Sequence, residues 1–120
     1  MVKKLRQILE QEDEWIDVPG PKYGKLPPLG RGERWSYSGV ENVPIENMHT
    51  IQYKVSKKGV EKYEKGEEEG EIKNPARVHI HTDEEGNEIP YLQDGHHRYV
   101  AALRRRKKNI LADVWRVVKD

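Results

Sequence analysis

The sequence predicts a small α/β (α+β) domain in which flanking helices cover a mixed sheet. Residues 77–82 alternate between polar and apolar side chains, and residues 88–93 follow after a turn-forming segment, which is typical of paired strands. Residues 56–65 and 94–103 have the composition and spacing of short helices. The chain has 120 residues, which is enough for one domain of this kind.

We expect two parts, an N-terminal helix with a Pro/Gly-rich arm over residues 1–40 and the domain itself over residues 41–120. Apolar residues recur at helical spacing from Leu5 to Ile16, so residues 3–14 are predicted to form an amphipathic helix. Its apolar stripe would pack on the domain or dock another protein. Prolines and glycines crowd residues 19–39, which predicts an irregular arm.

The arm mixes basic and aromatic side chains, and two interpretations stay open. Such residues can follow a nucleic-acid backbone and stack on bases, or they can form a solvated loop whose aromatic rings pack on the sheet. The residues concerned are Lys22, Lys25, Arg31 and Arg34 with Tyr23, Trp35 and Tyr37.

The domain begins with a short edge strand over residues 42–46. Ser56 is expected to cap a helix that runs to about Lys65 and ends at Gly66. The next residues, 67–69, are three glutamates, which are expected to form a solvated turn. The hairpin of residues 77–82 and 88–93 follows.

The second hairpin strand leads directly into a helix for which Asp94 is the expected N-cap. Gly95 to Arg98 would form its first turn, where N–H groups lack intrahelical partners and the helix dipole is positive. Glycine allows an anion to approach, and Arg98 can donate two hydrogen bonds to phosphate. The sequence therefore predicts a phosphate site at Gly95, His96, His97, Arg98 and Tyr99.

After this helix, the basic run Arg104–Lys108 has two interpretations. Cations in a last helical turn complement the dipole, and Arg104, Arg105, Lys107 and Lys108 would alternatively contact nucleic acid. Residues 110–118 are apolar on both faces, which predicts a strand inside the sheet.

Composition narrows the function classes. The formal net charge is +1, which argues against a globally basic nucleic-acid binder. The chain has no cysteine, so thiol chemistry and cysteine-bound zinc are excluded. No apolar stretch is long enough for a membrane span, and we expect a cytoplasmic protein without a membrane partner.

The string Asp94-Gly95-His96-His97-Arg98-Tyr99 resembles the signature of the ParB/sulfiredoxin superfamily. The likeness extends in order to residues 43–48, 55–65, 74–80 and 110–115. The resemblance implies a ParB-like domain that binds a nucleotide of the CTP or ATP/ADP type, with Mg²⁺ as an accompanying ion. It also implies DNA partition or phage-type DNA handling, with DNA, a second copy of the chain or a protein on the N-terminal helix as partners.

Two departures limit the resemblance. Sulfiredoxins carry a cysteine where this chain has His96, so sulfiredoxin activity is not expected. Residues 119–120 leave no room for a helix-turn-helix module after the last strand, so we expect no operator recognition by one.

Alternatives from other classes stay open. An enzyme of the same fold would be a small-molecule kinase like the free-serine kinases, a nucleotide hydrolase or a nuclease, with Glu46, Asp94 and His96 as candidate catalytic groups. A metal site would draw on His79, His81, His96 and His97, but their spacing matches no standard signature and we predict none. A third alternative is a protein-interaction module without a ligand.

Overall fold

The computed structural model describes residues 14–18, 22–69 and 74–120. Within these residues a mixed sheet has the strand order β2-β4-β7-β6-β8-β3, and β1 pairs with β5 in a separate two-stranded ribbon. This confirms the predicted α+β class. The elements are β1 Trp15–Asp17, β2 Lys22–Tyr23, β3 Glu33–Pro44, β4 His49–Thr50, β5 Lys54–Ser56, α2 Lys57–Glu69, β6 Ala76–Thr82, β7 Glu88–Asp94, α3 His96–Arg104 and β8 Asn109–Lys119.

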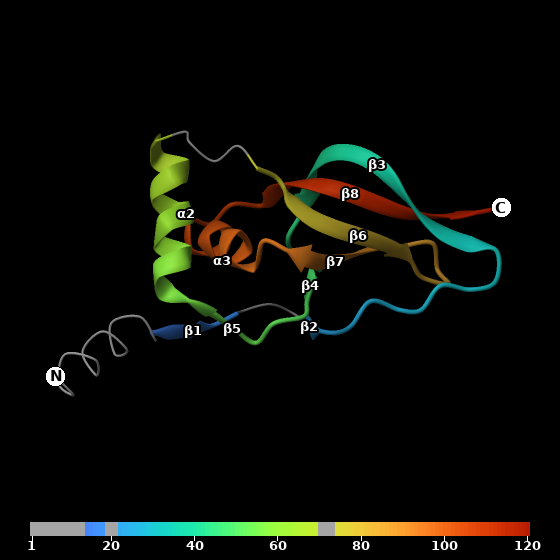
Figure 1. Ribbon diagram of the computed structural model, residues 1–120, viewed down its shortest axis with the longest axis horizontal. Helices are drawn as coiled ribbons and strands as arrows, with labels where there is room; N and C mark the ends of the chain where they lie inside the picture. Colours follow the sequence, from blue (N-terminus) through green and yellow to red (C-terminus); the bar gives the residue numbers. More distant parts are fainter. Residues whose placement is uncertain (1–13, 19–21, 70–73) are drawn as a thin grey trace, which may run out of the picture.

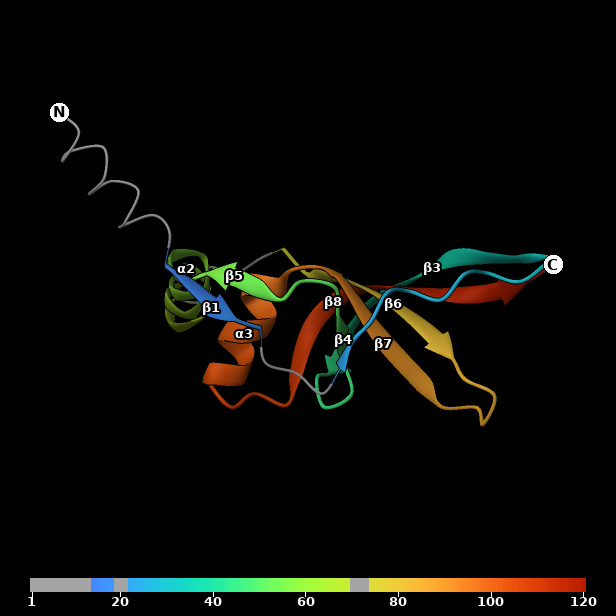
Figure 2. The ribbon, with the colours of Figure 1, turned by 90° about the horizontal axis from the view of Figure 1, so that it is seen from below.

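The two helices lie together at one end of the sheet, while β3, β8, β6 and β7 extend away from them (Figures 1 and 2). Helix α3 buries the run Tyr99–Ala102 in the core. From the sheet, Val78 of β6 lies opposite Val114 of β8 in parallel register, and both are fully buried. The hydrophobic core is therefore concentrated where the helices meet the sheet.

Strand β8 lies inside the sheet, as its apolar pattern predicts. It pairs with β6 in parallel and with β3 antiparallel. Ile110, Ala112 and Val114 are all buried. The predicted hairpin is also confirmed, because β6 and β7 pair antiparallel from Thr82↔Glu88 inward.

The start of α3 differs from the prediction. Asp94 is not the N-cap, because the ladder with β6 continues through a register shift to Arg77↔Asp94 and holds Asp94 in β7. Gly95 becomes the N-cap with φ of 102°, a backbone conformation that glycine adopts with little strain.

The prediction that residues 33–39 belong to an irregular arm is wrong. Strand β3 begins at Glu33 and pairs with β8 over almost its whole length. Gly39, with φ of 104°, lies at the register shift and lets the long strand keep its pairing. The expected boundary between residues 40 and 41 therefore falls inside one strand.

Helix α2 is longer than predicted. Gly66 does not end it, and residues 67–69 form its last turn instead of a separate acidic turn. A glycine inside a helix costs only about 1 kcal/mol, and burial of Val60 stabilises this one. The predicted cap is confirmed, because Ser56 Oγ accepts the Gly59 N–H at 3.2 Å.

The predicted helix over residues 3–14 lies outside the described residues, except for Glu14. Trp15 and Ile16, the last residues of its apolar pattern, belong to β1. In the part of the chain that the structure describes, no helix is both long and apolar enough to cross a membrane.

Candidate functional site

The first turn of α3 lacks a side-chain cap. Gly95 occupies the N-cap position in the left-handed conformation and offers no side chain to the N–H groups that follow it. Such groups carry the positive end of the helix dipole and bind anions in many proteins. The turn begins one residue later than predicted, at Gly95 instead of Asp94.

One side of Gly95 is occupied by the protein itself. A Cβ atom at this position would lie 2.8 Å from Ala76 Cβ at the beginning of β6. The glycine therefore allows α3 to pack close to β6, and it also permits the left-handed backbone at the start of the helix. An anion would have to approach the N–H groups from the side away from Ala76.

His97 connects the first turn of α3 with the first turn of α2. Its Nε2 lies 3.2 Å from Ser56 Oγ, the same oxygen that caps α2. Gly59 makes this approach feasible, because a Cβ there would come within 2.2 Å of the imidazole. Two helix N-termini thus meet around a single hydrogen bond, and their dipoles add positive potential at the same place.

Arg98 is buried beside this turn, with 7% of its surface exposed. Its Nη1 donates a hydrogen bond to the carbonyl oxygen of Asn74, just before Pro75. The guanidinium is therefore turned inward, toward the segment that leads into β6. A buried guanidinium brings its charge close to the N-terminus of α3 and also ties down that segment.

His96 is a core residue. It is 3% exposed, and its Nε2 accepts the N–H of Ile51 at 3.2 Å. Burial lowers its pKa to about 4, against a smaller opposing effect of Asp94. The imidazole is consequently neutral at pH 7 and adds no positive charge to the turn.

Tyr99 and the two candidate carboxylates occupy different surroundings. Tyr99 is fully buried, its hydroxyl has no hydrogen-bond partner among the described residues, and burial raises its pKa. Asp94 is exposed at the end of β7. Glu46 lines a cavity whose lining contains none of residues 94–99. The structure therefore does not gather Glu46, Asp94 and His96 into one cavity.

The basic run lies at the far end of α3. Arg104 pairs with Glu64 of α2 at 3.3 Å, and Arg105 Nη1 donates to the Glu64 carbonyl oxygen at 3.5 Å. The helix ends at Arg104, so Arg104 is the only residue of the basic run that lies in its last turn. Contact of the run with nucleic acid stays a prediction.

The histidines of the alternative metal site are separated. His79 is buried against Trp35, with ring centroids 4.5 Å apart, and burial together with Arg77 lowers its pKa. His96 and His97 contact Ile51 and Ser56 instead. Across the described ranges, no group of three or more histidine, aspartate or glutamate side chains is arranged to hold a metal ion.

The aromatic residues predicted in the arm lie on the sheet. Trp35 packs on His79, and Tyr37 packs on Trp115 at 5.3 Å while its hydroxyl donates to Asp113 at 2.6 Å. The arm was interpreted either as a nucleic-acid contact or as a loop whose rings pack on the sheet, and the second interpretation describes Trp35 and Tyr37.

Sequence reasoning did not include Gly59 and Asn74 in the site. Both contact its side chains from segments far away in the sequence. Ser56 was predicted only as a cap for its own helix, and its approach to His97 depends on how α2 packs on α3.

A scan of protein-family models and a search of curated proteins gave no match. Among solved structures, the chain is similar to sulfiredoxin from Arabidopsis thaliana, with a TM-score of 0.48 and 14% sequence identity. The similarity covers 62% of this chain and 82% of the sulfiredoxin chain.

Proposed function

We propose that the chain binds a phosphate-bearing ligand, a nucleotide, at the start of α3. The observation that carries the proposal is the meeting of two helix N-termini, joined by the His97–Ser56 contact. Glycine at the N-cap leaves the first N–H groups of α3 without a side-chain cap. Helix N-termini of this kind stabilise bound phosphate through N–H donors and dipole charge.

Each residue of the turn has a role in this proposal. The N–H groups after Gly95 donate to phosphate oxygens, and His97 adds a donor from its imidazole. Arg98 supplies a nearby positive charge that burial strengthens. The buried Tyr99 hydroxyl has no partner in the part of the chain that the structure describes, and this supports a ligand nearby because an unsatisfied buried hydroxyl is costly.

The resemblance of the motif supports the biological setting. A ParB-like domain would use CTP or an adenine nucleotide, with Mg²⁺, as a switch in DNA partition or phage-type DNA handling. The chain would then bind DNA or a second copy of itself in a nucleotide-dependent way.

A thermal-unfolding panel tests the proposal. CTP, ATP and ADP are added to the full chain with and without Mg²⁺, and the midpoint of unfolding is measured. A ligand that binds only the native state adds about 2.7 kcal/mol of stability at 100 times its dissociation constant. We expect a raised midpoint for at least one nucleotide.

Matched variants locate the binding. His97→Ala and Arg98→Lys should each reduce the nucleotide-dependent shift, whereas Arg104→Gln, at the opposite end of α3, should leave it unchanged. The proposal fails if no nucleotide changes the midpoint, or if both site variants respond like the wild type. Release of product during the assay would favour the kinase, hydrolase or nuclease alternative.

A further inference from the structure

A cavity of about 250 Å³ opens on the sheet beyond the helices. Ile80 and Arg116 line it, and they share a sheet face with the core residues Val78 and Val114 because side chains alternate along β6 and β8. The cavity shares no lining residue with the first turn of α3. What binds there is therefore a separate question from the proposed nucleotide site.

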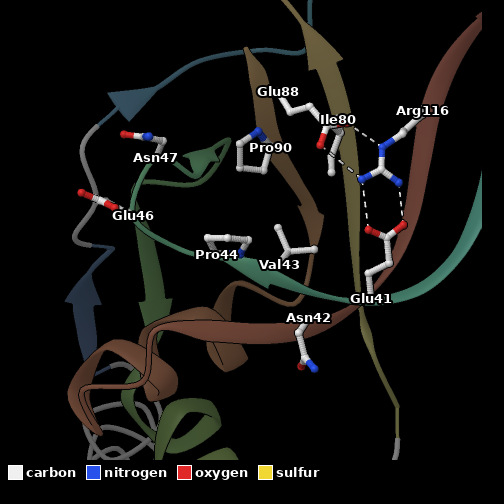
Figure 3. A pocket seen from close by; sticks show the side chains of 10 residues that line it. All are labelled: Glu41, Asn42, Val43, Pro44, Glu46, Asn47, Ile80, Glu88, Pro90 and Arg116. Carbon is white, nitrogen blue, oxygen red and sulfur yellow. Dashed lines mark hydrogen bonds and ion pairs between the residues drawn. The ribbon is translucent and has the colours of Figure 1, made fainter. Parts of the chain in front are cut away.

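One wall of the cavity is an ion-pair triad that crosses the sheet (Figure 3). Arg116 of β8 donates to both oxygens of Glu41 on β3, at 2.5 and 3.0 Å. It also donates to both oxygens of Glu88 on β7, at 2.7 and 3.4 Å. Bidentate pairs of this kind hold a guanidinium in a fixed plane.

The triad uses most of the hydrogen-bonding capacity of the guanidinium. Four of its five N–H groups donate to the two carboxylates. The flat faces of the group are not used by these bonds. A guanidinium face stacks well on an aromatic ring.

The opposite part of the cavity suits a ring as well. Pro44 and Pro90 stand on two sides of the space, with Val43 and Ile80 between them and the triad (Figure 3). Small-molecule sites are commonly lined by apolar groups with a few fixed polar ones. The volume admits one small ring system.

Charge excludes anionic ligands. Three carboxylates, those of Glu41, Glu46 and Glu88, line the cavity against one cation, Arg116. An added carboxylate or phosphate would be repelled by this excess of negative charge, and four of the five guanidinium N–H groups already donate to Glu41 and Glu88.

We propose that this cavity binds a neutral planar aromatic ring, stacked on the Arg116 guanidinium beside Val43 and Ile80, with Pro44 and Pro90 on the far side of the space. The ring belongs either to a free small molecule or to an aromatic side chain of a peptide, since both offer the same surface. The triad acts as a rigid platform, and the prolines set the width of the space.

Two probes of similar size test the stacking. Phenol and cyclohexanol are titrated separately into the full ¹⁵N-labelled chain, and amide shifts are followed by NMR. Phenol should shift the amides of Val43, Ile80 and Arg116 in a saturable way, and cyclohexanol, which has no π face, should bind at least several-fold more weakly. Benzoate should not bind.

Variants keep the test decisive. Arg116→Gln should abolish the preference for phenol, while Arg104→Gln, which removes an ion pair outside the cavity, should preserve it. If Arg116→Gln does not fold, Glu88→Gln provides the second test, because the Glu41 pair remains. Glu88→Gln should retain phenol binding and weaken the exclusion of benzoate, since one of the three negative charges that line the cavity is lost.

Equal binding of phenol and cyclohexanol, or the absence of shifts at the cavity, would overturn the proposal. Adenosine and N-acetyltryptophanamide then identify the source of the ring. Preference for the first indicates a free heteroaromatic molecule, and preference for the second indicates a peptide side chain. Neither result depends on nucleotide binding at α3.

Discussion

At the level of single residues, Gly95 combines two requirements that only glycine meets. Its φ is positive, and Ala76 occupies the space where a side chain would begin. Either requirement alone makes substitution unfavourable, and the two costs have different physical origins. One is backbone strain and the other is steric overlap.

We expect Gly95→Ala to lower the free energy of unfolding by about 2–4 kcal/mol, the sum of left-handed strain and overpacking. Gly86→Ala is the matched control, because Gly86 also has a positive φ but no atom within 4 Å of an added Cβ. Urea unfolding of both variants separates the two costs. Equal losses would show that contact with Ala76 does not matter.

His96 makes stability depend on pH. Its pKa is about 4 in the folded chain and about 6.5 when unfolded, so folding favours the neutral form. The resulting contribution is present above pH 6.5 and is lost as the pH falls toward 4, by about 3 kcal/mol in total. Chemical unfolding between pH 7 and 4 should show this slope.

His96→Gln, which retains an acceptor for the Ile51 N–H, should flatten much of the slope. A His96→Gln slope equal to that of the wild type would contradict the assignment.

At the level of elements, α3 ends in a conformation that favours glycine but carries arginine. Arg106 has φ of 56°, and its N–H donates to the Leu103 carbonyl oxygen at 3.0 Å. Left-handed residues after a helix are usually glycine because a Cβ is strained there.

Arg106→Gly should therefore raise the free energy of unfolding by up to about 1 kcal/mol. Arg105→Gly, at the preceding residue with φ of −90°, should lower it. Thermal or urea unfolding of the two variants checks the difference in sign. Destabilisation by both would mean that the side chain of Arg106 outweighs its backbone strain.

The elements also show which features the sequence can predict. The β6–β7 hairpin, β8 and the cap at Ser56 follow from patterns within a few residues, and all are confirmed. Strand β3 was expected only at its end, within residues 42–46. Its earlier part was missed because Gly39 and the prolines and glycines just before the strand indicate a loop locally. Its pairing partner, β8, lies more than 60 residues away in the chain.

The candidate site also has a part that is predictable from local sequence and a part that is not. The run from Gly95 to Arg98 could be selected from its own sequence. The neighbours that define its geometry, Ser56 and Asn74, come from other elements and depend on tertiary packing.

At the level of the whole molecule, stability is unevenly distributed. The buried residues gather where α2 and α3 meet β6 and β8, while β2 and the β1–β5 ribbon have few pairing residues. Local opening is governed by such differences in packing.

Hydrogen exchange should reveal this pattern. Amides of residues 78–80 and 112–114 should exchange most slowly, and those of β2 and β1 should exchange fastest. Comparable protection in β2 and β8 would contradict this uneven distribution of stability. Residues 33–37 should show intermediate protection, because β3 pairs on one side only.

The C-terminal residue is anchored far from the helices. The Asp120 N–H donates to the Gly32 carbonyl oxygen at 2.9 Å, its carboxylate pairs with Arg34, and Figure 1 places it at the opposite end of the sheet from α3. A biotin tag or fluorophore attached after Asp120 would therefore leave the Gly95 turn open to solution. Surface-immobilised or dye-labelled chain can report ligand capture there without the linker competing for the same space.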